Sequence, residues 1–184
     1  MRTRSLILLC TFTSVGYALA HLSTEDMREG HAESLMFISS VVGNVLGAGI
    51  LWAACAFFAG KLYARSAPAA ICSTMTLLTM LAVHYSLLFA LGVYQGYVFF
   101  NNWLWFVAAC LAGPLLGLVG SWSRNQPRWN MILPIGMILE ALLYQLVNLA
   151  SPLLRQTHKA ELLVGFVMLA AGITLLTIQV RRRR

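Results

Sequence analysis

Residues 162–180 read LLVGFVMLAAGITLLTIQV, a run of 19 residues that contains no charged side chain. A membrane-spanning helix needs about 20 mostly apolar residues to cross the ~30 Å hydrocarbon layer of a bilayer, and this run meets that length. A helix also satisfies its own backbone hydrogen bonds, which is necessary where no water is present. Residues 162–180 therefore predict a transmembrane helix.

Five further apolar segments precede this one along the chain. They cover residues 5–22, 35–60, 67–91, 103–121 and 131–149. None shows the alternation of apolar and polar residues that is typical of a membrane β-barrel strand. Short stretches with turn-forming or charged residues separate the segments, so consecutive helices should be antiparallel neighbours. The sequence predicts an all-α fold: a polytopic transmembrane bundle of six helices, formed by residues 1–184 as a single domain.

The composition excludes a water-soluble domain. The 184 residues are 59% hydrophobic and 10% charged, whereas soluble domains average about 45–50% apolar and about 25% charged residues. The net charge of +7 does not indicate nucleic-acid binding, because most of the excess lies beside the helix ends and in Arg181–Arg184. A basic tail directly after a membrane helix attracts anionic lipid. We therefore expect the bilayer, and anionic lipid at Arg181–Arg184, as partners, with no nucleic acid.

The distribution of Lys and Arg predicts the orientation of the helices. Cytoplasmic loops of membrane proteins carry an excess of these residues. If both termini are cytoplasmic, ten basic residues lie inside and three, Arg28, Arg155 and Lys159, lie outside. The sequence therefore predicts that both the N-terminus and the C-terminus are cytoplasmic. The ten inner residues are Arg2, Arg4, Lys61, Arg65, Arg124, Arg128 and Arg181–Arg184.

The first segment has a second interpretation. A basic N-terminus, an apolar run and Ala18-Leu19-Ala20 also resemble a secretory signal with a small-x-small cleavage site. Cleavage there would leave five helices and the same topology for the rest of the chain. We expect a retained helix instead, because residues 5–22 exceed a usual signal core. Gly16 and Ala20 also form a small-x-x-x-small pair that suits helix packing.

Two Gly-x-x-x-Gly runs predict close packing between helices. Gly43 and Gly47 form the first run, and Gly113 and Gly117 form the second, which Gly120 extends. Glycines four residues apart remove side chains from one helix face, so that a neighbouring backbone can approach. A hinge or bent helix beside a cavity is an alternative interpretation, and so is a homodimer face.

Glu140 is the most informative polar residue because it lies at the centre of an apolar segment. A charge at that depth costs at least ~2.5–3.5 kcal/mol, so its side chain should face the protein interior and find a polar partner. Tyr144 and Asn148 follow on the same helix at four-residue steps. Asn44 and His84 lie in the second and third segments. We expect these five residues to surround a common ligand or proton site; the alternative is a polar cluster that only holds the helices together.

The sequence predicts no catalytic residue, no metal site and no cofactor. The four cysteines lie inside apolar segments and lack the Cys-x-x-Cys spacing of a redox pair or zinc site. These residues are Cys10, Cys55, Cys72 and Cys110. The chain also lacks the Gly-x-Ser-x-Gly and His-Glu-x-x-His motifs and a glycine-rich phosphate loop. The hypothesis of a membrane enzyme that uses Glu140 and His84 is therefore supported by no recognised catalytic motif.

Three segments carry a family resemblance. They are residues 52–60 (WAACAFFAG), 65–68 (RSAP) and above all 111–122 (LAGPLLGLVGSW). With Trp129 and Glu140, they resemble an uncharacterised family of bacterial six-span membrane proteins of unknown function, found mainly in Gram-positive lineages. The likeness covers about residues 35–145. It implies six helices and a location in a bacterial plasma membrane, but no activity and no site.

These observations lead us to expect a small-molecule binding or transport subunit with a polar site around Glu140. The sequence contains no domain for energy coupling, so such a subunit would need a membrane partner or form a homo-oligomer. The alternative is a non-catalytic scaffold or assembly factor that binds through its Gly-x-x-x-Gly faces, and the second alternative is the membrane enzyme.

Overall fold

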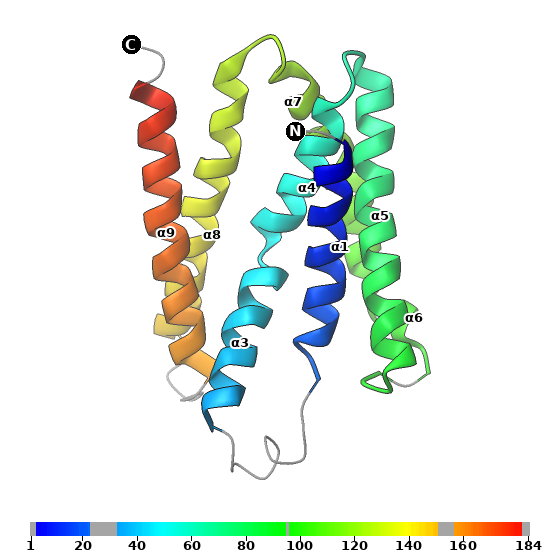
Figure 1. Cartoon of the computed structure of the whole chain (residues 1–184), viewed down its shortest axis with the longest axis vertical. Helices are drawn as coiled ribbons and strands as arrows, with labels where there is room; N and C mark the ends of the chain where they lie inside the picture. The colour runs from blue at the N-terminus through cyan, green and yellow to red at the C-terminus, as the bar shows by residue number, and fades with distance from the viewer. Residues whose placement is uncertain (1–2, 23–32, 95, 151–156, 182–184) are drawn as a thin grey trace. The chain divides into compact units, whose positions relative to one another are not determined.

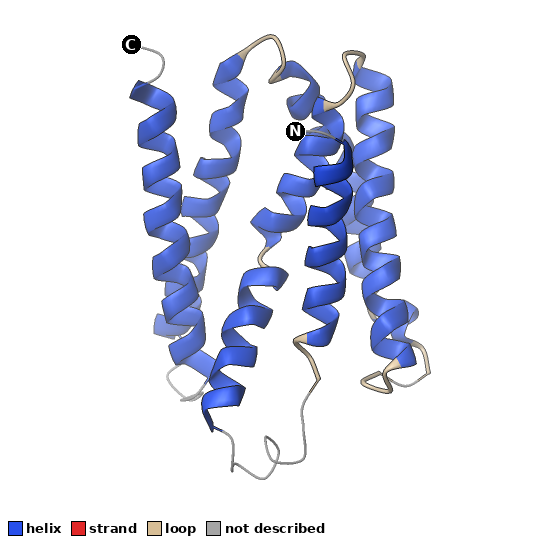
Figure 2. Ribbon diagram, in the orientation of Figure 1, coloured by secondary structure: helices blue, strands red, loops and turns tan. Residues whose placement is uncertain are grey.

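The computed structural model describes residues 3–22, 33–94, 96–150 and 157–181, with side chains for all of these except 147–150, 157 and 158. Helices dominate these residues, and no strand occurs among them (Figure 2). The helices are α1 (Thr3–Leu19), α3 (Glu33–Gly47), α4 (Gly49–Lys61), α5 (Ser66–Ala90), α6 (Val98–Asn101), α7 (Trp103–Trp122), the 3-10 helix η1 (Pro127–Met131), α8 (Ile132–Ala150) and α9 (Thr157–Arg181) (Figure 1).

The all-helical fold is confirmed for the described part of the chain. Five helical stretches are long and apolar enough to cross a membrane. These are Glu33–Lys61, Ser66–Ala90, Trp103–Trp122, Pro127–Leu146 and Lys159–Arg181. Helix α1 is also apolar but shorter, with 17 residues. The chain is thus a multi-pass membrane protein with five to six candidate spans, while the sidedness of its termini stays a prediction.

The chain divides into two compact units. Unit 1 comprises residues 1–22 and 51–129, and unit 2 comprises residues 23–50 and 130–184. The border between residues 50 and 51 falls inside the second predicted span, within the first turn of α4. The expectation that the whole chain forms one domain stays a prediction, and each unit is described by itself.

Glycines on α7 set the packing of unit 1. Helices α5 and α7 lie side by side (Figure 1). A Cβ atom at Gly117 would lie 2.5 Å from the carbonyl oxygen of Ala69 and 2.8 Å from Oγ of Ser73. At Gly113 it would lie 2.6 Å from Cα of Thr74. No side chain fits at these positions, so α5 and α7 approach each other through the glycine face.

Helix α4 also packs against this glycine face of α7. A Cβ atom at Gly120 would overlap the carbonyl oxygen of Phe57, and one at Gly60 would overlap the backbone of Gly117. The hydroxyl of Ser73 on α5 donates a buried hydrogen bond of 2.6 Å to the carbonyl oxygen of Ala56 on α4. Helices α4, α5 and α7 are therefore in direct backbone contact with one another.

Unit 2 is built on α3, α8 and α9. A Cβ atom at Gly165 on α9 would lie 2.8 Å from Nε2 of Gln145, and one at Gly172 would lie 2.8 Å from Cγ1 of Ile138 on α8. These glycines are seven residues apart, which places them on one helix face. Sequence analysis did not single them out. The core of the unit consists of Ala48, Ala141, Val164 and Met168.

The second predicted span is not one continuous helix. We expected a helix over residues 35–60, but α3 ends at Gly47 and α4 begins at Gly49. The amide of Ala48 bonds the carbonyl of Val45 at 3.3 Å, three residues back, as in the tightened last turn of a helix. Glycine is a poor helix former, and two glycines flank Ala48. This sequence therefore weakens the helix at one point.

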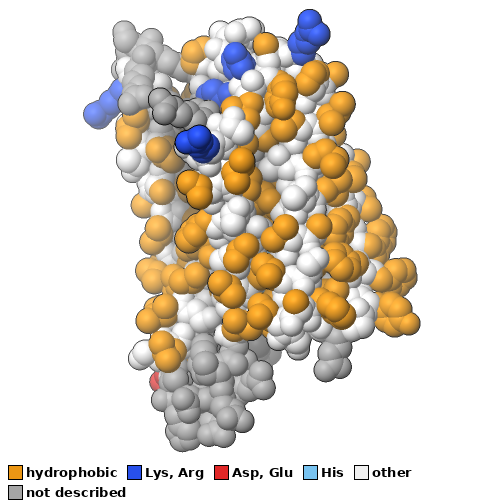
Figure 3. Space-filling view, turned by 45° about the vertical axis from the view of Figure 1, so that its right-hand side comes forward, with side chains coloured by type: hydrophobic (Ala, Val, Ile, Leu, Met, Phe, Trp, Pro, Cys, Tyr) orange, Lys and Arg blue, Asp and Glu red, His pale blue; other side chains and the backbone are white. Residues whose placement is uncertain are grey.

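Large apolar side chains cover the outer surface of the helices. Ile71 on α5, Leu115 on α7 and Phe166 on α9 are 65%, 64% and 61% exposed. Figure 3 shows hydrophobic side chains over much of the visible face and Lys and Arg side chains towards one end. In water such a surface would be an aggregation hazard, whereas in a bilayer it contacts acyl chains.

Candidate functional site

Helix α8 presents Glu140 to the break between α3 and α4. Oε1 of Glu140 accepts the N–H of Gly49 at 2.6 Å, and Oε2 accepts the N–H of Ile50 at 2.7 Å. These amides belong to the first turn of α4, where the N–H groups have no partner within their own helix. Glu140 therefore caps α4 with a side chain that comes from another span.

The electrostatics of this contact suit an acidic side chain. The N-terminus of a helix carries a partial positive charge, and an anion beside it is stabilised. Each of the two oxygens of Glu140 accepts one main-chain hydrogen bond, at 2.6 Å and 2.7 Å, which is at the short end of the range for N–H···O bonds. The contact thus supplies what an acidic residue in an apolar segment needs.

Glycines lie on both sides of this contact. A Cβ atom at Gly49 would lie 3.4 Å from Oε1 of Glu140, which is ordinary van der Waals contact. One turn before Glu140, a Cβ atom at Gly136 would lie only 3.0 Å from Cδ1 of Ile50. An alanine at position 136 would therefore require the end of the Ile50 side chain to shift by a few tenths of an ångström.

Two of the other predicted site residues lie in unit 2 with described side chains. Asn44 is half-buried on α3, one turn before the break. Tyr144 is half-buried on α8, one turn after Glu140, and it packs against the core around Ala48. The backbone of Asn148 continues α8, while its side chain lies outside the described residues.

His84 belongs to unit 1, where aromatic rings enclose it. Its side chain is 4% exposed and stacks on the ring of Tyr17, with centroids 4.6 Å apart and planes at 10°. Trp52 and His21 contact it edge-on at 6.1 Å and 5.8 Å. Nδ1 of His84 lies 3.4 Å from the carbonyl oxygen of Ser14 on α1. A site that His84 shares with the acidic residue of α8 stays a prediction, because the two belong to different units.

The cysteines are free, and Cys10 and Cys55 contact each other through their thiols in unit 1. Within residues 3–22, 33–94, 96–150 and 157–181, no three His, Cys, Asp or Glu side chains are grouped so that they could hold a metal ion. The described residues therefore contain no disulfide bond and no candidate metal centre.

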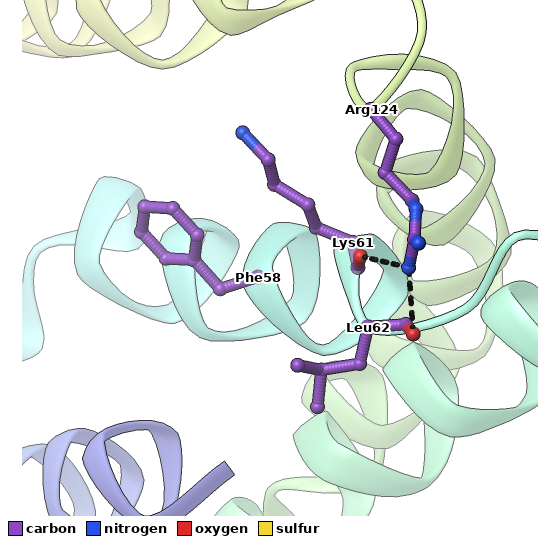
Figure 4. A pocket seen from close by; sticks show the side chains of 4 residues that line it. All are labelled: Phe58, Lys61, Leu62 and Arg124. Carbon is purple, nitrogen blue, oxygen red and sulfur yellow. Dashed lines mark hydrogen bonds between the residues drawn. The ribbon is translucent and has the colours of Figure 1, made fainter. Parts of the chain in front are cut away.

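A pocket of about 340 Å³ lies at the end of α4 in unit 1. It is lined by Phe58, Lys61, Leu62 and Arg124 (Figure 4). Nη1 of Arg124, which follows α7, donates to the carbonyl oxygens of Lys61 at 3.2 Å and Leu62 at 2.9 Å. The guanidinium thus satisfies carbonyls at the C-terminus of α4, where a positive charge is favourable.

Sequence analysis missed the groups that bind Glu140. The sequence indicated a polar partner from the second or third span, with Asn44, His84 and Tyr144 as candidates. The partners are main-chain amides of Gly49 and Ile50 in the second span. Every residue except proline has such an amide, so the residue type at these positions carried no signal. Two glycines around one residue in the middle of a span were the available sign of a break.

Residues 46–184 match a family of unknown function, DUF6518. The chain belongs to this family. The part that matches DUF6518 includes both sides of the contact between α4 and α8 and all four residues that line the pocket. No curated protein and no solved structure matches the chain. The resemblance to an uncharacterised family agrees with this match, while six spans and a bacterial origin stay expectations.

Proposed function

We propose that this protein is a membrane-embedded small-molecule binding or transport subunit in which Glu140 controls the position of the broken second span. The observation that carries the proposal is the pair of hydrogen bonds from Gly49 and Ile50 to the Glu140 carboxylate. Many transporters place broken helices near the centre of the bilayer, because the interrupted backbone offers polar groups there.

The contact can act as a latch that depends on charge. A carboxylate accepts both amides and complements the positive end of α4, whereas a neutral side chain at position 140 lacks this charge, and the amide of glutamine has only one acceptor oxygen. Hydrogen bonds to charged groups contribute about 1.5–3 kcal/mol each. A change of that size shifts an equilibrium between two positions of α4 by at least about tenfold.

The predicted ligand groups of unit 2 are Asn44, Tyr144 and Asn148, in addition to Glu140. We assign them to ligand contact because they lie on α3, which ends at the break, and on α8, which carries Glu140. His84 completes the predicted set from α5. Energy for transport would come from a partner subunit or from an ion gradient. A cytoplasmic orientation of both termini and a bacterial plasma membrane belong to the same proposal.

The alternative function, a scaffold that binds a partner through the glycine face of α7, is less well supported. The backbones of α4 and α5 already occupy the face formed by Gly113, Gly117 and Gly120 within unit 1. A partner helix would have to displace one of them. Binding of a small molecule does not require such a displacement, because it needs only a rearrangement of the chain at the break between α3 and α4.

Native mass spectrometry of the purified protein tests the proposal. We expect a small molecule to copurify with the protein and to raise its melting temperature when it is added back. Glu140→Gln should fold but lose this ligand-dependent rise, because the charge that holds α4 is gone. Glu33→Gln is the matched control, since Glu33 is an exposed acidic residue in the first turn of α3.

Two results would overturn the proposal. One is a Glu140→Gln variant whose ligand-dependent stabilisation equals that of the unmodified protein. The other is a stoichiometric membrane partner that copurifies without any small molecule, which would favour the scaffold.

A further inference from the structure

The basic residues of unit 1 have no acidic counterpart within that unit. Residues 1–22 and 51–129 contain no Asp or Glu. Four basic residues lie close to helix ends in the second of these ranges: Lys61 is the last residue of α4, Arg65 precedes α5, Arg124 follows α7 and Arg128 lies in η1. Unit 1 therefore has several basic side chains at its helix ends and no carboxylate of its own.

Two of these charges line the pocket at the end of α4. Its volume is about 340 Å³, and Lys61 and Arg124 supply its polar groups. The two hydrogen bonds that fix Arg124 use Nη1 alone, and a guanidinium has five N–H donors. Arg124 can therefore hold an oxyanion while it caps α4. Figure 4 shows its side chain reaching from the end of α7 over the last carbonyls of α4.

The remaining walls of the pocket are apolar. Phe58 and Leu62 are half-buried and lie one turn apart on the same stretch of chain as Lys61. A soluble anion would gain nothing from contact with these side chains. An amphipathic anion would gain from both kinds of wall.

Aromatic residues mark this end of unit 1 as a membrane–water interface. The rings of Trp122 and Trp129 pack together with centroids 5.2 Å apart, at the end of α7 and in η1. The guanidinium of Arg128 lies over the ring of Trp129 at 5.7 Å. Trp side chains prefer the level of the lipid headgroups, so the pocket lies at the depth where lipid phosphates are found.

We propose that this pocket binds an anionic phospholipid, with its phosphate between Lys61 and Arg124 and an acyl chain along Phe58 and Leu62. The inference is independent of the function proposed for Glu140, because it uses none of the same residues. It is also distinct from the nonspecific attraction expected at the basic C-terminal tail, since it requires a defined pocket.

Lipid retention measured by native mass spectrometry tests this proposal. The protein is equilibrated with equal amounts of phosphatidylglycerol and phosphatidylcholine before the detergent is removed in the gas phase. We expect the unmodified protein to retain phosphatidylglycerol in preference. Lys61→Gln should reduce that preference about fivefold, which is the usual contribution of one basic residue near a membrane surface. Arg65→Gln is the matched control, because Arg65 is exposed and does not line the pocket.

Three results would overturn the proposal. The first is equal retention of the two lipids by the unmodified protein. The second is an equal loss of preference in Lys61→Gln and Arg65→Gln, which would indicate diffuse attraction instead of a site. The third is stabilisation by inorganic phosphate alone that matches the stabilisation by phosphatidylglycerol, which would indicate a site for a soluble anion.

A salt titration of the unmodified protein tests the lipid pocket even if the Lys61→Gln variant fails to fold. The preference for phosphatidylglycerol is followed as ionic strength rises. Charges inside a pocket are screened less than charges on an open surface. We therefore expect the preference to persist at a salt concentration that abolishes the contribution of Arg181–Arg184, measured as the difference between the unmodified protein and a full-length variant in which these four residues are glutamine. Loss of both at the same salt concentration would contradict the pocket.

Discussion

The carboxylate of Glu140 lies 2.6 Å from the amide nitrogen of Gly49, although the two residues are 91 positions apart in the sequence. The amide belongs to the first residue of α4, so a side chain on α8 determines how this helix begins. The break in the second span is therefore a tertiary feature of unit 2. It involves the local sequence around Ala48 and the hydrogen bonds of one distant side chain.

Glu140→Ala should lower the free energy of unfolding by about 3 kcal/mol or more, because it removes two charge-assisted hydrogen bonds and leaves two amides without a partner. Glu140→Gln should cost about half as much, since the amide oxygen can still accept one of them. Thermal unfolding in detergent measures both effects. Glu33→Ala should cost no more than about 1 kcal/mol, as expected for an exposed acid in a first helical turn. Equal melting temperatures for Glu140→Ala and Glu33→Ala would contradict the latch.

Gly117→Ala should destabilise unit 1 by about 1–3 kcal/mol, which is the usual cost of an overpacked core. The added Cβ atom would lie 2.5 Å from the carbonyl oxygen of Ala69, so α5 and α7 must move apart. Ala112→Val is the control, because Ala112 is exposed on the same helix. The melting temperature and the yield of folded protein should fall for the first variant only.

Ala18→Leu should destabilise the protein by a similar ~1–3 kcal/mol. Ala18 is fully buried and packs into the core formed with Ala56, Leu77 and Leu81. Thr11→Leu, at an exposed position of the same helix, should have little effect. If residues 1–20 were instead removed as a signal, neither substitution would change the mature protein, and mass spectrometry would find the chain starting after Ala20.

Labelling of introduced cysteines should place the two ends of α5 on opposite sides of the membrane. Ala64 and Val93 lie in the loops before and after this helix. From the distribution of basic residues, an impermeant maleimide added to intact cells should label Val93→Cys. It should label Ala64→Cys only after permeabilisation, and the unmodified protein serves as background. The reverse pattern would refute cytoplasmic termini.

Sequence patterns predicted most helix positions closely. The expected spans 67–91 and 103–121 correspond to α5 at Ser66–Ala90 and α7 at Trp103–Trp122. Span length follows from bilayer thickness, so a long apolar run suffices to locate such a helix. The same rule failed at Ala48, because the residues around the break are as apolar as those of an unbroken helix.

The candidate site was only partly predictable. The energetic cost of a charge in hydrocarbon indicated that Glu140 needs a polar partner. It could not indicate which partner, because a main-chain amide leaves no trace in the residue type. The pocket beside Lys61 was not predicted either. In the sequence, Lys61 and Arg124 served only as part of the excess of basic residues that predicts which helix ends are cytoplasmic.

Hydrogen exchange at the amides of Gly49 and Ile50 tests directly whether Glu140 holds the start of α4. In the unmodified protein both amides should exchange slowly, because both are hydrogen-bonded to the carboxylate. Glu140→Ala should accelerate their exchange by about tenfold for each 1.4 kcal/mol of lost stabilisation, and Glu33→Ala should leave it unchanged. Exchange at the same rate in the unmodified protein and in Glu140→Ala would contradict the latch.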